Sequence, residues 1–259
     1  MIAQLFVSPN SKDVYFLSAK ITKFGLSKAK LIITAVCCLF SILSLFFVYA
    51  NNGETFDYFY CLATIAFVCL PTLLSIIFKW KLNTGFYVVF SLYALGPLLG
   101  AVYALYYVTW WWDDLLHALA GVLFAICGAY IAIILNRNGK THYLLSALFG
   151  LFFSMGIAVL WELFEYSADM LLGSDMQADT VVNYLATKAG RNDGGLTIFE
   201  GIQNVVIDGK PLGLGGYLDI GLIDTVSDMA VETAGGILYF IYAVIDRERH
   251  PLILSIRNQ

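Results

Sequence analysis

Six long apolar segments constrain this chain more than any other feature of its sequence. A helix needs about 20 mostly apolar residues to cross the hydrocarbon core of a bilayer. Hydrophobic residues make up 59% of the chain and charged residues only 13%, a balance that excludes an ordinary soluble domain. The sequence therefore predicts an all-α polytopic membrane protein with about six transmembrane helices. We expect the spans at residues 31–50, 56–78, 85–109, 113–135, 143–166 and 222–245.

The third of these segments contains Gly96 and Pro97, which interrupt a regular helix. Such breaks are tolerated in transmembrane helices where neighbouring helices satisfy the freed backbone groups. We therefore expect residues 85–109 to form one span.

The basic residues predict the orientation, because cytoplasmic loops are enriched in Lys and Arg. With six spans, both ends of the chain lie on one side of the membrane. That side would hold twelve basic residues: Lys12, Lys20, Lys23, Lys28, Lys30, Lys79, Lys81, Arg137, Lys140, Arg247, Arg249 and Arg257. The other side would hold three: Lys188, Arg191 and Lys210. We expect a lysine-rich cytoplasmic segment at 1–30, a transmembrane domain at 31–245 and a cytoplasmic tail at 246–259.

Ionisable side chains gather at the extracytoplasmic ends of the last three spans. Within each span they are spaced three or four residues apart, so they share one helix face. Ionisable groups are costly inside a bilayer, and their presence indicates a functional site. At about 1.5 Å per residue, Glu232 would lie about 12 Å deeper than Asp224, so we expect a funnel that narrows inward. The group comprises Asp113, Asp114, His117, Glu162, Glu165, Asp169, Asp224, Asp228 and Glu232.

Eight acids and one histidine make up these motifs, with no Lys or Arg among them. Carboxylates in low dielectric cannot all ionise unless protons or a cation neutralise them, so we expect a divalent metal ion as cofactor. The expected ligands are Asp114, His117, Glu162, Asp224 and Asp228. Glu165 or Glu232 would act as general base on a metal-activated water. Oxygen-rich ligation favours Mg, Ca or Mn, whereas His with carboxylates also suits Zn or Fe.

Each of these residues also has a simpler interpretation. Asp113 and Asp224 could be residues at helix starts, where the helix dipole favours acids. His117 could be a buried hydrogen-bonding residue, and Glu165 could face water. Glu162 and Asp228 are harder to explain, because each lies about one turn inside its span.

The long extracytoplasmic segment 167–221 is polar and rich in glycine. Apolar residues 205–207 followed by Asp208-Gly209 predict a β-hairpin. Loops longer than about 15 residues are usually functional or disordered, so we interpret this segment as a lid over the acidic site.

The three charged motifs also resemble a known family. They read D-D-x-x-H from Asp113 to His117, W-E-x-x-E-Y from Trp161 to Tyr166, and D-T-x-x-D-M-x-x-E-x-x-G-G from Asp224 to Gly236. This pattern resembles bacterial inner-membrane proteins of the YjdF-like kind and, more distantly, the VanZ-like family associated with teicoplanin resistance. In VanZ-like proteins the last motif usually carries Asn where this chain has Glu232. The resemblance covers about residues 110–240 and implies a bacterial envelope setting, so we expect the protein in the bacterial cytoplasmic membrane. The distribution of basic residues places both termini in the cytoplasm.

Three functions are compatible with these features. The first is a metal-dependent hydrolase or transferase that acts on lipid or lipid-linked envelope substrates. The second is a cation or proton transporter, and the third is a non-catalytic envelope protein with a structural cation. The inner halves of the fourth and sixth spans are almost wholly apolar, which favours a one-sided site. No nucleic-acid partner is expected, and the sequence leaves the oligomeric state open.

Overall fold

The computed structural model describes residues 26–78, 82–135, 142–189 and 193–245. Six of its helices are long and apolar enough to cross a membrane. They are α3 (Lys28–Ala50), α4 (Thr55–Ile77), α5 (Thr84–Ala101), α7 (Trp112–Leu135), α8 (Tyr143–Leu172) and α9 (Leu222–Ile245). This confirms the predicted all-α membrane fold. The expected lysine-rich segment 1–30 lies largely outside the described residues, and the expected tail 246–259 lies wholly outside them.

The chain divides into two compact units. Residues up to Ile157, together with those from Val231 onward, form the first unit, and Ala158–Ala230 form the second. Helices α8 and α9 each contribute residues to both units.

The third span ends earlier than the sequence predicts. Helix α5 stops at Ala101, and a separate short helix, α6 (Leu105–Val108), follows it. Ala104 between them has φ 63°, a left-handed conformation that is uncommon for a residue other than glycine. Apolar composition alone carries no signal for such a break, so the predicted end of this span at residue 109 is wrong.

The fifth span is longer than predicted. Helix α8 contains 30 residues, which correspond to about 45 Å. This exceeds the hydrocarbon thickness of about 30 Å, so α8 is long enough to extend into the headgroup region. The expected boundary at residue 166 therefore falls inside the helix.

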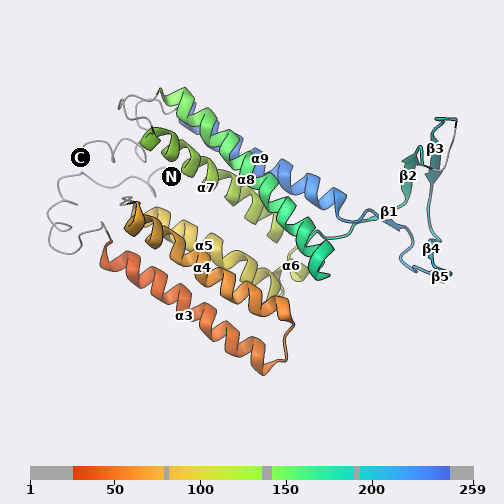
Figure 1. Ribbon diagram of the computed structural model, residues 1–259, viewed down its shortest axis with the longest axis horizontal. Coiled ribbons are helices and arrows are strands. Elements are labelled where there is room, and N and C mark those ends of the chain that lie inside the picture. Colours follow the sequence, from red (N-terminus) through yellow and green to blue (C-terminus); the bar gives the residue numbers. More distant parts are fainter. Residues whose placement is uncertain (1–25, 79–81, 136–141, 190–192, 246–259) are drawn as a thin grey trace. The chain divides into compact units, whose positions relative to one another are not determined.

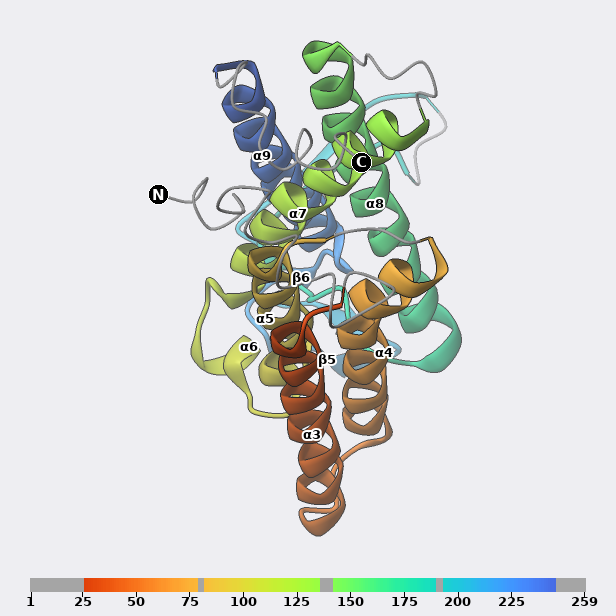
Figure 2. The same ribbon diagram turned by 90° about the vertical axis from the view of Figure 1, so that its left-hand side faces the viewer.

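Helices α3, α4 and α5 pack against one another in the first unit, and α3 and α4 lie side by side in both ribbon views (Figures 1 and 2). Hydroxyl groups pair between α3 and α4 (Thr34 with Thr72, 3.2 Å) and between α4 and α5 (Ser75 with Tyr87, 3.1 Å). Ser44 of α3 pairs with Tyr103, just beyond the end of α5, at 3.1 Å. Pairing satisfies polar groups that would otherwise be costly in an apolar environment.

Helix α7 connects this three-helix group to the remaining helices of the first unit. Leu123 of α7 belongs to an apolar cluster with Val68 of α4 and Phe90 of α5. Further along α7, small and aromatic side chains from α7, α8 and α9 form a second cluster: Ala125, Ile126, Ala129, Ala147, Tyr239 and Ala243. The N-terminal part of α7, before these clusters, carries Asp113 and His117.

The second unit contains three short antiparallel ladders between α8 and α9. Strand β1 (Val181–Val182) pairs with β6 (Tyr217–Leu218), and β2 (Tyr184–Thr187) pairs with β3 (Thr197–Glu200). Strand β4 (Val206–Ile207) pairs with β5 (Lys210–Pro211) through Asp208 and Gly209, whose φ angles are 48° and 77°. Positive φ at both turn residues is what a type I′ hairpin requires, so the predicted β-hairpin is confirmed.

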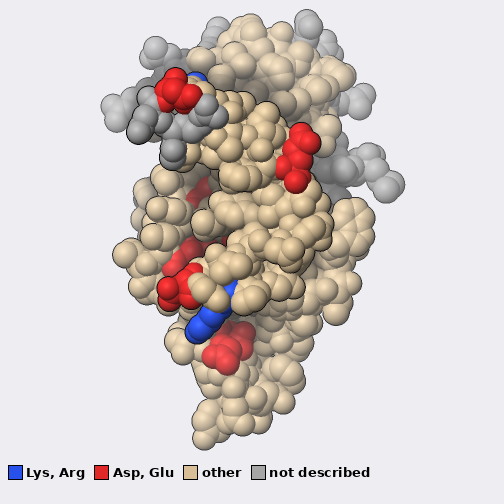
Figure 3. All heavy atoms as spheres, turned by 90° about the vertical axis from the view of Figure 1, so that its right-hand side faces the viewer, with Lys and Arg blue, Asp and Glu red and all other residues tan. Residues whose placement is uncertain are grey.

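On the face shown in Figure 3, acidic and basic side chains form small separate groups on a largely uncharged surface.

Candidate metal centre

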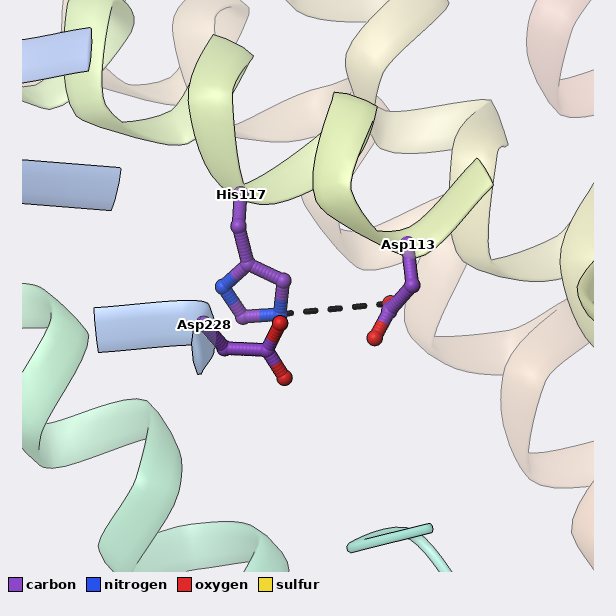
Figure 4. Close-up of side chains that lie close together, drawn as sticks. All are labelled: Asp113, His117 and Asp228. Carbon is purple, nitrogen blue, oxygen red and sulfur yellow. Dashed lines mark ion pairs between the residues drawn. The ribbon is translucent and has the colours of Figure 1, made fainter. Parts of the chain in front are cut away.

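Asp113 and His117 form an ion pair on the first turns of α7. They are four residues apart on one helix, and Oδ1 of Asp113 lies 3.9 Å from Nε2 of His117. Figure 4 shows both side chains projecting from α7, with this ion pair dashed. The Asp113 side chain is 41% exposed and that of His117 only 8%. The pair therefore joins an accessible carboxylate to a buried imidazole. The partner of His117 on α7 is Asp113, whereas the sequence favoured Asp114 as a metal ligand.

The second nitrogen of His117 faces a carboxylate on another helix. Nδ1 lies 3.6 Å from Oε2 of Glu232 on α9, and the Glu232 side chain is only 2% exposed. His117 thus has one carboxylate opposite each ring nitrogen, and the two carboxylates come from the fourth and sixth spans.

Glycine residues allow α7 and α9 to approach at this point. A Cβ atom built on Gly121 would lie 2.0 Å from the backbone oxygen of Glu232. On the facing helix, a Cβ atom on Gly235 would lie 2.3 Å from the backbone oxygen of Ala118. Both positions exclude any side chain, so the backbones are in direct contact. Gly121 is one turn beyond His117, and Gly235 is three residues beyond Glu232, so this contact sets the distance between the two functional side chains.

Helix α5 holds the start of α7. The indole Nε1 of Trp112 donates a hydrogen bond of 3.2 Å to the backbone oxygen of Gly96. A Cβ atom on Gly96 would lie 2.3 Å from Cδ2 of Leu116, so a larger residue there would displace that side chain. The glycine that interrupts the third segment in sequence is therefore the contact position for α7.

Tyr93 is a residue near the site that the sequence interpretation missed. It lies on α5, and the Glu232 carboxylate is near enough to act on its phenol through space. Its ring packs edge-on against Phe124 of α7, with centroids 6.2 Å apart. Tyr93 is four residues before Pro97, which has no N–H to donate to the Tyr93 carbonyl. That spacing is the one sequence signal that could have drawn attention to Tyr93.

The second unit contains three further buried acids: Glu162 and Glu165 on α8, and Asp228 on α9. The indole Nε1 of Trp161 donates a hydrogen bond of 2.9 Å to Oε1 of Glu165. Glu165 is therefore not the water-facing residue of the simpler interpretation. Along α9, burial increases from Asp224, which is half-buried, to Asp228 and Glu232, which are both buried. Helical spacing places these three acids on one face of α9.

Asp169 and Asp224 have structural partners within the second unit. Oδ1 of Asp169 accepts hydrogen bonds from Ser174 Oγ at 2.6 Å and from the backbone N–H of Met176 at 2.7 Å. Its Oδ2 accepts the backbone N–H of Gln177 at 2.8 Å, and Oδ2 of Asp224 accepts that of Ala178 at 2.9 Å. These bonds hold the chain that leaves α8, while metal ligation by Asp224 stays a prediction.

Asp219 accepts hydrogen bonds at the other end of the segment between α8 and α9. Its Oδ1 accepts the N–H of Thr180 at 2.8 Å, and its Oδ2 accepts the N–H of Ile223 at 2.7 Å. Gln177 also donates a side-chain hydrogen bond to Thr225. The ends of the expected lid are therefore joined, and any lid movement would have to take place between Thr180 and Asp219.

A comparison with family models places the chain in a family. The model described as "Predicted membrane protein (DUF2238)" matches residues 30–249, which include all three charged motifs. This chain belongs to the DUF2238 family. The match is consistent with the resemblance to YjdF-like membrane proteins, whereas no comparison shows a VanZ-like relationship. Searches of curated proteins and of solved structures found no match.

Proposed function

We propose that this integral membrane protein is a metal-dependent hydrolase or transferase that acts on a lipid or lipid-linked substrate at the extracytoplasmic face of the bacterial inner membrane. The observation that carries the proposal is the buried imidazole of His117, which has a carboxylate opposite each of its ring nitrogens.

The spacing between Asp113 and His117 suits a shared metal ion. A metal–nitrogen bond of about 2.0–2.1 Å and a metal–oxygen bond of about 2.0–2.2 Å can together span at most about 4.3 Å. The 3.9 Å between Nε2 and Oδ1 lies within that reach. Asp228 is four residues before Glu232 on the continuous helix α9, so it shares the face of Glu232 and is our next candidate ligand.

The exposure of Asp113 supports a catalytic rather than a closed structural site. Catalytic metal sites keep one position open for water or substrate, whereas structural sites are filled by protein ligands. The Asp113 side chain is 41% exposed, so the Asp113 side of the pair is accessible. A divalent ion held there would lower the pKa of a bound water and make it a nucleophile at neutral pH. Metal ligation by Glu162 and a general-base role for Glu165 stay predictions from the sequence.

A transporter is less compatible with the first unit. Ions or protons crossing the membrane need polar groups along the whole path. Beyond the site, α7 and α9 instead contribute Ala125, Ile126, Ala129 and Ala243 to a buried apolar cluster. This cluster favours a site that opens to one side only.

The orientation in this proposal depends on the distribution of basic residues. Twelve of the fifteen Lys and Arg residues fall on the side of the termini if the six spans alternate in direction. The positive-inside rule then places the termini in the cytoplasm and the Asp113 end of α7 on the extracytoplasmic side.

An activity assay with metal-depleted and metal-loaded protein tests the proposed reaction. Protein purified in detergent would be stripped with a chelator, reloaded with Zn, Mn or Mg, and incubated with phospholipids and with polyprenyl-linked phosphates and pyrophosphates. We expect a metal-dependent release or transfer product that His117→Ala abolishes and His142→Ala retains. His142 is the matched control because it is exposed and far along the chain from the site. A His117→Ala variant with undiminished turnover would rule out the proposed enzyme.

A further inference from the structure

We propose that Cys38 and Cys69 form a redox-active pair of thiols in the middle of the bilayer, which a lipid-soluble quinone oxidises to a disulfide between α3 and α4. The observation that carries the proposal is the contact between the two sulfur atoms, which lie 3.7 Å apart. Both residues belong to the first unit, and their helices contribute none of the proposed metal ligands. The thiol pair is therefore independent of the proposed metal enzyme.

A second contact holds the two helices together beside the thiols. Thr34 lies one turn before Cys38 on α3. Thr72 lies three residues after Cys69 on α4, and the two threonine hydroxyl groups are 3.2 Å apart. Residues three or four apart share one face of a helix, so both contacts fit a single antiparallel register. The sulfur contact therefore follows from the packing of α3 against α4.

Only a small movement separates this contact from a disulfide. A disulfide bond is about 2.05 Å long, so the two sulfurs must approach each other by about 1.7 Å. Rotation about the Cα–Cβ bonds moves both sulfurs while the helix backbones stay in place. The three-helix packing can therefore accommodate the reduced and the oxidised form.

Both thiols lie at the same depth in the membrane. Cys38 is ten residues after Lys28, where α3 begins, and Cys69 is eight residues before Ile77, where α4 ends. At about 1.5 Å per residue, these distances are about 15 and 12 Å from the same side, near the middle of a core about 30 Å thick. Water-soluble thiols such as glutathione do not enter this region, so the reaction partner must dissolve in lipid.

The pair is also accessible from the lipid. Cys38 and Cys69 are each half-buried, whereas Cys61 on α4 is fully buried. The residues that follow the two thiols in sequence, Leu39 and Leu70, are exposed on the outer surface of the helices. A quinone dissolved in the hydrocarbon can therefore approach the sulfurs.

The proposed reaction leaves no charge in the hydrocarbon. Thiols usually react as thiolates, and a charged group is costly at this depth. With a quinone, two S–H bonds break, one S–S bond forms, and two protons and two electrons pass to the two quinone oxygens. The quinone becomes a quinol, and the dithiol, the disulfide, the quinone and the quinol are all neutral.

The test is to add a short-chain ubiquinone to reduced protein in detergent without oxygen. The free thiols are then labelled with N-ethylmaleimide under denaturing conditions, and the digested protein is analysed by mass spectrometry without reductant. We expect labelled thiols to fall from five per chain to three, with one quinol formed and with Cys38 linked to Cys69. Cys38→Ala and Cys69→Ala should lose both the link and the quinol.

Two control variants make the assignment specific. Cys37→Ala changes the neighbour of Cys38 in sequence, and Cys61→Ala changes a buried thiol in a different apolar cluster. Both should form the link and the quinol as the wild type does. Five labelled thiols after treatment with quinone, or a link through another cysteine, would overturn the proposal. A link formed by iodine but not by the quinone would overturn it too, because the thiols would then be adjacent without reducing a quinone.

Discussion

Oε2 of Glu232 on the sixth span lies 3.6 Å from Nδ1 of His117 on the fourth. Neither side chain could reach the other if α7 and α9 were separated by ordinary side chains. The contact exists because Gly121 and Gly235 let the two backbones meet beside it. The buried contact between His117 and Glu232 therefore depends on the glycines at the helix crossing.

Gly121→Ala tests that arrangement. The added methyl group would lie 2.0 Å from the Glu232 backbone oxygen, so the helices must separate. We expect a loss of stability of about 1–3 kcal/mol, typical of overpacking, and weaker metal binding. Thermal unfolding in detergent and metal titration would measure both.

Gly156→Ala on α8 is the matched control, because nothing lies within 4 Å of the position of its Cβ atom. Alanine in a helix is favoured over glycine by about 0.5–1 kcal/mol, so this variant should be as stable as the wild type or slightly more stable. Equal behaviour of the two variants would show that the α7–α9 contact is not tight.

Trp112→Phe tests how α5 holds the start of α7. The substitution removes the hydrogen bond to the Gly96 carbonyl, and we expect a cost of about 1 kcal/mol in stability. Trp110→Phe should have no effect, because that side chain is 87% exposed. If Trp110→Phe proves the more harmful change, α5 does not position α7 through Trp112.

The sequence was sufficient for most of the spans and for one contact beside the candidate site. Span length and apolarity predict α3, α4, α7 and α9 closely, and four-residue spacing on one helix predicts that His117 and Asp113 share a face. The break at Ala104 was not predictable, because an alanine in the left-handed region leaves no trace in composition. The contact between His117 and Glu232 depends on the register of two helices, which hydropathy does not encode. Gly121, Gly235 and Gly236 were the available clue to it.

Asp169→Ala tests whether hydrogen bonds to Asp169 hold the start of the segment between α8 and α9. The Asp169 carboxylate accepts three hydrogen bonds from residues 174–177. Without them we expect faster proteolysis in residues 173–180, which limited digestion followed by mass spectrometry would detect. Asp179→Ala, at an exposed position on the same segment, is the control and should digest like the wild type. Identical digestion of both variants would mean that Asp169 does not hold this segment.

Asp175 gives the second unit a specific pH dependence. Asp175 is an exposed residue, and partial desolvation, followed by the neighbouring carboxylates of Asp179 and Asp169, raises its pKa above the ordinary value. A raised pKa in the folded state means that the folded protein prefers Asp175 protonated. The stability that the protonated form contributes is therefore lost as pH rises through the raised pKa. Asp175→Asn should therefore unfold at a higher temperature than the wild type at pH 7. The difference should vanish below about pH 4, near the ordinary pKa of aspartate. A larger difference at low pH would have the wrong sign for this explanation.

The metal content of purified protein tests the central proposal most directly. Wild type, Asp113→Asn, His117→Ala and His142→Ala would be purified in detergent without chelator and analysed by mass spectrometry for bound metals. The proposed site predicts one divalent ion per chain in the wild type and in His142→Ala, and its loss in His117→Ala and Asp113→Asn. The same metal content in all four proteins would contradict a metal centre at Asp113 and His117.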